Sequence, residues 1–322
     1  MSVSINGNSL VIDLSEVHPL ATMSMDFQRT LRIPDDNQIY PLPPGFGSFP
    51  LRSIEDFPNA PSKFKEHGGF MFPMYQSEAM WISFHGSYPI ALKIAAGSIN
   101  AIDGNIIESG LNCHGEQDYV AIPGQPWLDG FCVSKGNIRQ FVAMPLGSGL
   151  TVEEQLTGQA HFGGLQIIAY ALKAAKWEMA QISALRSRSV FYASASCSAL
   201  DTEMDACMGF GAGGMMHQEI SSDTYLVDDY DLEHPVVCHV NLCNSEQWHM
   251  MTNEPPPYKA PSPQDYTRAG LPWFDHYMDG NVIEGSEILA GVKSVNQILA
   301  EEGGEILSNN ESIQPGISII NL

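Results

Sequence analysis

Residues 117–145 read QDYVAIPGQPWLDGFCVSKGNIRQFVAMP. Short apolar runs alternate in this stretch with turn residues, in the order strand, tight corner, strand, hairpin and strand. That order is typical of antiparallel β structure. The stretch also contains Lys135 and Arg139, two of the few cations in the chain.

Similar apolar runs lie on both sides of this stretch. Before it they recur about every 8–12 residues, which is the spacing of a sandwich or barrel. Residues 23–33 alternate well, with Met23, Met25 and Phe27 on one face and Arg29 interrupting that face. The other runs are residues 70–75, 80–84, 90–94, 98–102, 165–170 and 236–242.

Helix signals are fewer and short. Thr151 with Glu154 forms the pattern of a capping box, and Asn244 is a good N-cap residue. The composition of residues 171–189 favours a helix over a strand. The sequence therefore predicts an α+β protein, predominantly antiparallel β, with sandwich- or barrel-like sheets and a few short helices.

The chain of 322 residues is long enough for two ordinary domains or one large one. We expect a β-rich module over residues 1–150, in which a long proline-rich loop (41–69) wraps the body and is held there by its aromatic residues. A second β-rich module, with short helices and a C-terminal tail, is expected over residues 151–322.

Composition limits the possible partners. The net charge of −22 repels phosphates, so nucleic acid is not an expected partner. Charged residues make up only 16% of the chain, against about 25% in an average protein. This low fraction favours self-association into a homo-oligomer, with a compact monomer as the alternative.

The compartment is predicted from what the sequence lacks. The chain begins without the cationic and apolar segments of a secretory signal, and no apolar run reaches the length of a transmembrane segment. Its six cysteines are spread out without a CxxC pair. We therefore expect free thiols and a cytoplasmic location.

One constellation has the residue types of a metal site. His217 and Glu219 alternate on a predicted strand and so share a face, and His239 lies on another strand. Two histidines and one carboxylate are the ligand set of non-haem iron and similar divalent metals. His249 or His276 could replace His239. The competing interpretation is that His217 is a hydrogen-bonded residue of the sheet.

Other patterns favour structural roles. The glycines at 209, 211, 213 and 214 precede a β-like run rather than a helix, so close backbone packing explains them better than a phosphate-binding loop. Cys238 and His239 are adjacent on a strand and point to opposite faces, so they cannot form a catalytic dyad. The sequence has no G-x-S-x-G elbow.

Several blocks resemble a family of uncharacterised microbial proteins. They are residues 118–147, EEQLTG (153–158), GGLQI (163–167), GLPWF (270–274) and LAGVKSV (289–295). The family has no assigned activity, so the resemblance implies no functional residue.

Three functions are therefore expected, in decreasing order of support. The first is a non-enzymatic binding or self-assembling protein that forms a homo-oligomer. The second is a metal-dependent enzyme built on His217, Glu219 and His239. The third is a membrane-active oligomer that starts as a soluble β-rich chain.

Overall fold

The computed structural model describes residues 1–112, 116–184, 207–256, 260–265, 273–275, 281–308 and 319–321. Most of its secondary structure is antiparallel β, as the sequence predicts. The longer strands are β1 (Ser2–Asn6), β2 (Ser9–Asp13), β3 (Thr22–Thr30), β6 (Phe70–Met74), β7 (Ala79–His85), β8 (Ile90–Ala96), β12 (Gly130–Ser134), β13 (Asn137–Pro145), β14 (Leu165–Ala171), β15 (Cys207–His217) and β16 (Val236–Asn244). The short strands are β4 (Ile39–Tyr40), β5 (Arg52–Ser53), β9 (Ile99–Asn100), β10 (Val120–Ile122), β11 (Trp127–Leu128), β17 (Trp273–Asp275) and β18 (Ile319–Asn321).

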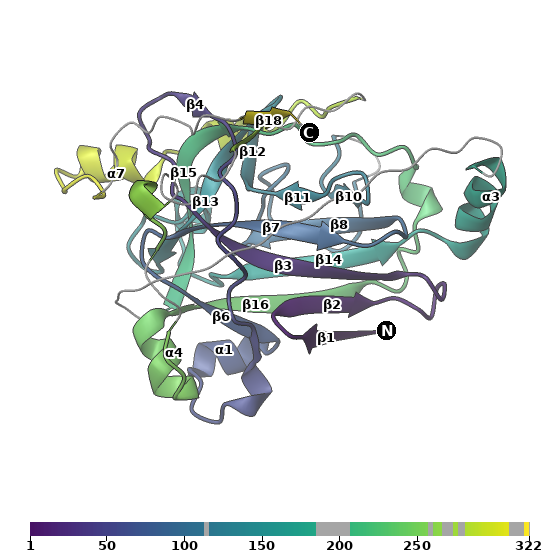
Figure 1. Cartoon of the computed structure of the whole chain (residues 1–322), viewed down its shortest axis with the longest axis horizontal. Helices are drawn as coiled ribbons and strands as arrows, with labels where there is room; N and C mark the ends of the chain where they lie inside the picture. The colour runs from purple at the N-terminus through teal and green to yellow at the C-terminus, as the bar shows by residue number, and fades with distance from the viewer. Residues whose placement is uncertain are drawn as a thin grey trace.

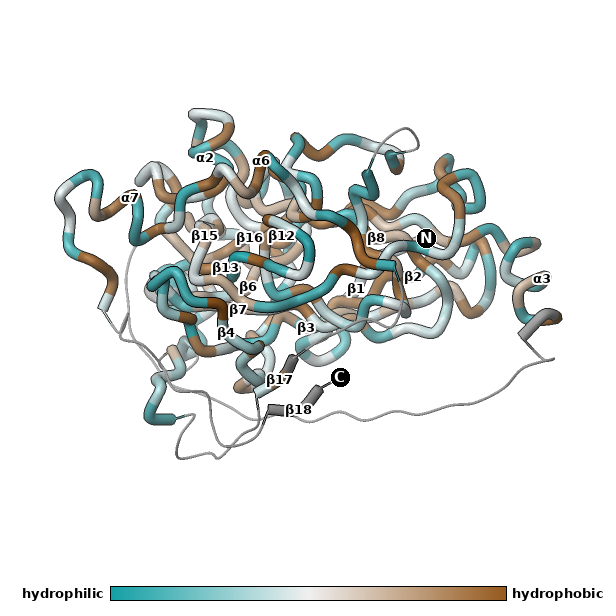
Figure 2. The backbone as a smooth tube through the Cα atoms, turned by 90° about the horizontal axis from the view of Figure 1, so that it is seen from above, coloured by the Kyte–Doolittle hydropathy of each residue, from teal (hydrophilic) through white to brown (hydrophobic). Residues whose placement is uncertain are grey.

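Within the described residues, β1 to β16 form one sheet whose main path runs β1-β2-β3-β7-β13-β15-β16-β14-β8-β10. The sheet folds over on itself, so that β2 and β3 pass in front of β16 and β14 (Figure 1). The tube drawn at right angles to this view also shows β3 apart from β8 and β16 (Figure 2). The fold is therefore a two-layered β structure.

The main core fills the space between the two layers. Alternate residues of β3 contribute Met23, Met25 and Phe27, all at most 2% exposed. The other layer supplies apolar side chains to the same cluster, for example the facing residues Ile94 of β8 and Ile167 of β14. Burying such side chains supplies most of the free energy that favours folding.

The stretch at 117–145 folds as its sequence predicts. It forms β10, a corner at Pro123 and Gly124, β11, and then the β12–β13 hairpin. Its last strand, β13, pairs with both β7 and β15 and so lies in the middle of the sheet.

The predicted boundary at residue 150 does not separate two sheets. Strand β8 from the first predicted module pairs with β14 from the second, and β13 pairs with β15. The two predicted modules therefore share one sheet and one core. The boundary itself falls in the short connection between β13 and the next helix.

The proline-rich segment at 41–69 packs against the body through its aromatic residues. Its aromatic residues Phe46, Phe49 and Phe64 are at most 8% exposed and Phe57 packs against a satellite cluster. The loop also contains the 3-10 helix η1 (Ile54–Asp56) and the helix α1 (Ser62–His67).

The other helices are short: α2 (Val152–Thr157), α3 (Ala174–Ala184), α4 (Ser245–Thr252), α6 (Glu287–Ala290), α7 (Val295–Glu301) and the 3-10 helix η2 (Val227–Asp229). The capping box of Thr151 and Glu154 is present at the start of α2. Helix α3 confirms the helical interpretation of residues 171–189 over residues 174–184, whereas Ala171 still belongs to β14. Helix α4 follows Asn244 as predicted.

The glycines of β15 permit close packing. A Cβ atom at Gly214 would lie 2.3 Å from the carbonyl oxygen of Pro34, and one at Gly211 would lie 2.6 Å from Val295 Cγ2. Neither position has room for a side chain. The structural interpretation of this glycine-rich stretch is therefore confirmed, because β15 is overlaid by the chain after β3 and by α7.

Candidate functional site

The structure brings together two of the three predicted metal ligands. His217 ends β15 opposite Asn137, and Glu219 follows two residues later. A Cβ atom at Gly136 would lie 3.3 Å from His217 Nε2 and 3.6 Å from Glu219 Cγ. Both side chains therefore lie over the β12–β13 turn, as their alternation predicts.

His239 lies in another part of the sheet. It is opposite Gln166 of β14, and its ring stacks on His67 of α1 at a centroid distance of 5.6 Å. Strands β15 and β16 pair only at their Cys207 and Cys243 ends. His217 is farther along β15 by about 30 Å of extended chain, at about 3.3 Å per residue.

No group of three or more His, Cys, Asp or Glu side chains within the described ranges is placed to hold a metal ion. Of the two alternative ligands, His249 has its Nδ1 3.0 Å from the carbonyl oxygen of Glu254, and His276 is outside those ranges. Of the three predicted metal ligands, the structure thus places His217 and Glu219 close together and His239 elsewhere in the sheet.

The surroundings of His239 form a small aromatic cluster. The His67 ring also contacts Phe162, with centroids 4.9 Å apart, and Phe162 contacts His161 at 4.4 Å. Burial lowers the pKa of His239, and the neighbouring His67 lowers it further. This cluster attaches α1 to the outer side of β16 through the contact between the His67 and His239 rings.

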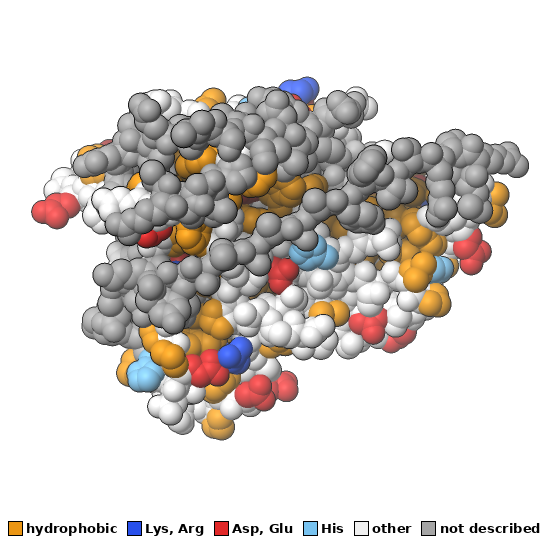
Figure 3. Space-filling view, in the orientation of Figure 1, with side chains coloured by type: hydrophobic (Ala, Val, Ile, Leu, Met, Phe, Trp, Pro, Cys, Tyr) orange, Lys and Arg blue, Asp and Glu red, His pale blue; other side chains and the backbone are white. Residues whose placement is uncertain are grey.

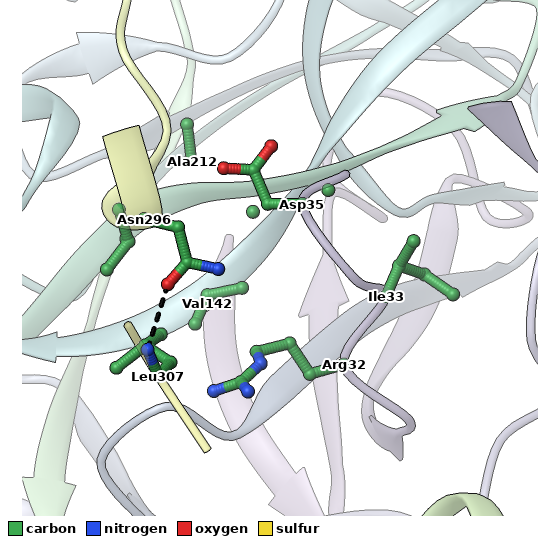
Figure 4. Close-up of a pocket in the computed structure, with 10 residues that line it drawn as sticks. Arg32, Ile33, Asp35, Val142, Ala212, Asn296 and Leu307 are labelled. Carbon is green, nitrogen blue, oxygen red and sulfur yellow. Dashed lines mark hydrogen bonds between the residues drawn. The ribbon is translucent and has the colours of Figure 1, made fainter. Parts of the chain in front are cut away.

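A small cavity lies where the chain leaves β3 (Figure 4). Its volume is about 10 Å³, which is room for about one water molecule and far below the roughly 300–1,000 Å³ of typical ligand pockets. Figure 4 shows Arg32, Asp35 and Asn296 around it, from the segment after β3 and from α7. The remaining walls are apolar or glycine, including Val142 of β13.

The polar groups of this cavity hold chain segments together. The guanidinium of Arg32 donates to the carbonyl oxygens of Ser77 and Ser308, and burial lowers its pKa to about 10. Asn296 Oδ1 accepts a hydrogen bond of 3.1 Å from the Leu307 amide. The Arg32 side chain therefore remains a cation at neutral pH and has no role as an acid or base there.

The carboxylate of Asp35 is the other charge at this cavity. It lies 3.5 Å from the Arg139 guanidinium and accepts a hydrogen bond from the Ser294 hydroxyl, the N-cap of α7. Asp35 thus connects the segment after β3 to both β13 and α7. We interpret the cavity as a structural junction.

Two buried carboxyl groups have strongly raised pKa values. Burial raises the pKa of Glu78 to about 7, although its ion pair with Arg29 at 2.7 Å opposes this shift. Burial raises the pKa of Asp129 to about 8, opposed by a hydrogen bond of 2.9 Å from Gln218 Nε2.

Raised carboxyl pKa values often mark catalytic sites. Glu78 and Asp129 are 1% and 2% exposed, however, and each is bonded to neighbouring strands or turns. Sequence reasoning missed both groups as buried ionisable residues. The one indication of a buried charge in the sequence was Arg29, which interrupts the apolar face of β3.

No protein-family model, curated protein or solved structure matches the chain. In the part of the chain that the structure describes, no helix has the length and apolarity needed to cross a membrane. Figure 3 shows one face of the molecule, with scattered acidic side chains and few basic ones.

Proposed function

We propose that this chain is a non-enzymatic protein that self-associates through the edge strand β1. The observation that supports this proposal is an uncharged strand edge with an unused row of hydrogen-bonding groups. Strand β1 is the first strand of the sheet and lies at the margin of the molecule (Figure 1). Among the strands that the structure describes, it pairs only with β2.

The hairpin register identifies the unused groups. A two-residue loop connects the facing residues Asn6 and Ser9, so these two form a hydrogen-bonded pair. Alternation along the strand then directs the N–H and C=O of Val3 and Ile5 away from β2. None of the hydrogen bonds found among the described residues involves these four outward groups.

Strand β1 lacks the features that usually protect an edge. Proteins place charges, prolines or bulges on exposed edge strands to prevent pairing with other chains. Residues 2–6 read SVSIN, with no charge and no proline, and the β1–β2 register is regular. The opposite edge, β10, is only three residues long and is followed by Pro123.

The proposed partner is a second copy of the chain. If two β1 strands pair antiparallel about Ser4, Val3 faces Ile5 of the other copy and Ile5 faces its Val3. Both pairs use the outward groups, so the interface is isologous, as in most homodimers. The half-buried side chains of Val3 and Ile5 already pack against the main core and would extend it across the interface.

The expected dimer is weak. Four backbone hydrogen bonds contribute about 1 kcal/mol each, and the four apolar side chains add a similar amount. Association costs at least about 4 kcal/mol. Each copy also has a net charge of −22, so added salt should strengthen the dimer by screening the repulsion.

The location we propose is the cytoplasm. The cysteines at 132, 207, 238 and 243 are free thiols, which fits a reducing compartment. The acidic composition supports a role without nucleic acid.

Light scattering over a concentration series tests this function. The net free energy of about 4 kcal/mol corresponds to a Kd of about 1 mM, so we expect the dimer fraction to grow as the concentration approaches millimolar and to be larger at higher salt. The Val3→Pro variant removes one outward N–H and leaves the β1–β2 hydrogen bonds intact, so it should shift the chain toward monomer. The matched control Val3→Thr keeps that N–H and should still dimerise. A wild-type chain that is monomeric throughout would refute the proposal.

A further inference from the structure

We infer that Cys207 and Cys243 form a redox-active dithiol that oxidises to an intramolecular disulfide. The two residues face each other on the antiparallel strands β15 and β16, and both are free thiols in this structure. Residues that face each other across two strands point to the same side of the sheet. The side chains meet in the satellite apolar cluster that also contains Trp248.

The backbone geometry suits a disulfide. The carbonyl oxygen of Cys207 accepts a hydrogen bond from the Leu146 amide, so this residue directs its backbone groups toward β13. The facing pair with Cys243 is therefore of the non-hydrogen-bonded kind, in which the Cα atoms are about 4.5 Å apart. That separation is inside the range of about 4.4–6.8 Å found across disulfides.

The two thiols differ in access, which sets the order of the reaction. Cys207 is half-buried, and the ammonium group of Lys63 partly offsets the rise in the Cys207 pKa that burial causes. Cys243 is 0% exposed, and its thiol donates to the carbonyl oxygen of Asn244 at 3.2 Å. Cys207 therefore meets an oxidant first, and Cys243 resolves the product.

Hydrogen peroxide is the oxidant we assign. The Cys207 thiolate attacks one peroxide oxygen, the O–O bond breaks, and the hydroxide that leaves takes up a proton to form water. Cys207 is now a sulfenic acid. The Cys243 sulfur, as it loses its proton, attacks Sγ of Cys207; the S–O bond breaks, the S–S bond forms, and a second water leaves. One peroxide is reduced by two electrons and the two thiols are oxidised by two.

The reaction is slow for a physical reason. Burial raises the pKa of both thiols, so little thiolate is present at neutral pH. A reducing cytoplasm keeps the pair as a dithiol, and oxidation joins the start of β15 to the end of β16. This dithiol does not depend on the β1 interface, because Cys207 and Cys243 belong to one chain.

Peptide mapping of the full-length chain after peroxide treatment tests the inference. We expect a peptide pair that joins Cys207 to Cys243, and an intact mass lower by two hydrogen atoms for that bond. The bond should be lost again with dithiothreitol. Oxygen addition without this cross-link, or a disulfide that joins either cysteine to another partner, would overturn the assignment.

Two variants separate the roles. In Cys243→Ser the cross-link cannot form, so a dimedone adduct should accumulate on Cys207. The control Cys238→Ser removes a buried thiol that faces Ile167, and it should oxidise at the rate of the wild type. A dimedone adduct no larger in Cys243→Ser than in the wild type would contradict the resolving role of Cys243.

Discussion

Replacing Asp129 with asparagine should stabilise the protein more at alkaline than at acidic pH. The carboxyl group is 2% exposed, and burial raises its pKa from 3.8 to about 8. The folded state therefore retains a proton that the unfolded state loses as pH rises from about 4 to about 8. The contribution of Asp129 to the free energy of unfolding is therefore fully present below about pH 4, the pKa of the unfolded state. It decreases as the pH rises to about 8 and stays low above that pH.

The size of the effect follows from the pKa difference. Each pH unit inside the window costs about 1.4 kcal/mol, so the three units from about pH 5 to about pH 8 cost about 4 kcal/mol. The asparagine side chain of the Asp129→Asn variant cannot ionise, and its amide oxygen can accept the hydrogen bond from Gln218 Nε2 that Asp129 Oδ2 accepts now.

The assay is urea unfolding of both chains, followed by tryptophan fluorescence, at about pH 5 and about pH 8. Other titrating groups, including Glu78, are common to both chains and cancel in the difference. We expect the stability difference between Asp129→Asn and wild type to grow by about 4 kcal/mol from the lower to the higher pH. The same difference at both pH values would refute the proposed protonation of Asp129.

Two further perturbations test the packing around β16 and β15. Burial, and secondly the neighbouring His67, lower the pKa of His239 in the folded state, so acid should destabilise the wild type as pH falls below about 6.5. The His239→Gln variant should lose part of this pH dependence in thermal unfolding at about pH 5 and about pH 7. An unchanged dependence would show that His239 does not cause it. Gly214→Ala should lower the free energy of unfolding in urea by about 1–3 kcal/mol, because its Cβ would lie 2.3 Å from the Pro34 oxygen. In the control Gly291→Ala the nearest contact is 3.4 Å, so this variant should be nearly as stable as the wild type. Equal effects of the two substitutions would contradict the close approach at Gly214.

Local structure could be predicted because its causes are local. The alternation in residues 23–27 and the capping box at Thr151 each depend on neighbours within a few positions. The same reasoning placed His217 and Glu219 together, since residues two apart on a strand share a face.

Pairing between distant strands could not be predicted in this way. The relation of His239 to His217, and that of Cys207 to Cys243, depend on which strands become neighbours and in which register. The same reason applies to the boundary predicted at residue 150. No residue near this position indicates that β13 pairs with β15 across it in a single sheet.

The dimer through β1 is tested most directly by a charge exchange at Ser4. This exposed residue would face its own copy across the two-fold axis. Ser4→Lys alone and Ser4→Glu alone should each be monomeric by analytical ultracentrifugation, because like charges would face each other. An equal mixture should recover a dimer that contains one chain of each kind. Dimers of either variant alone, as strong as those of the wild type, would contradict pairing through this strand.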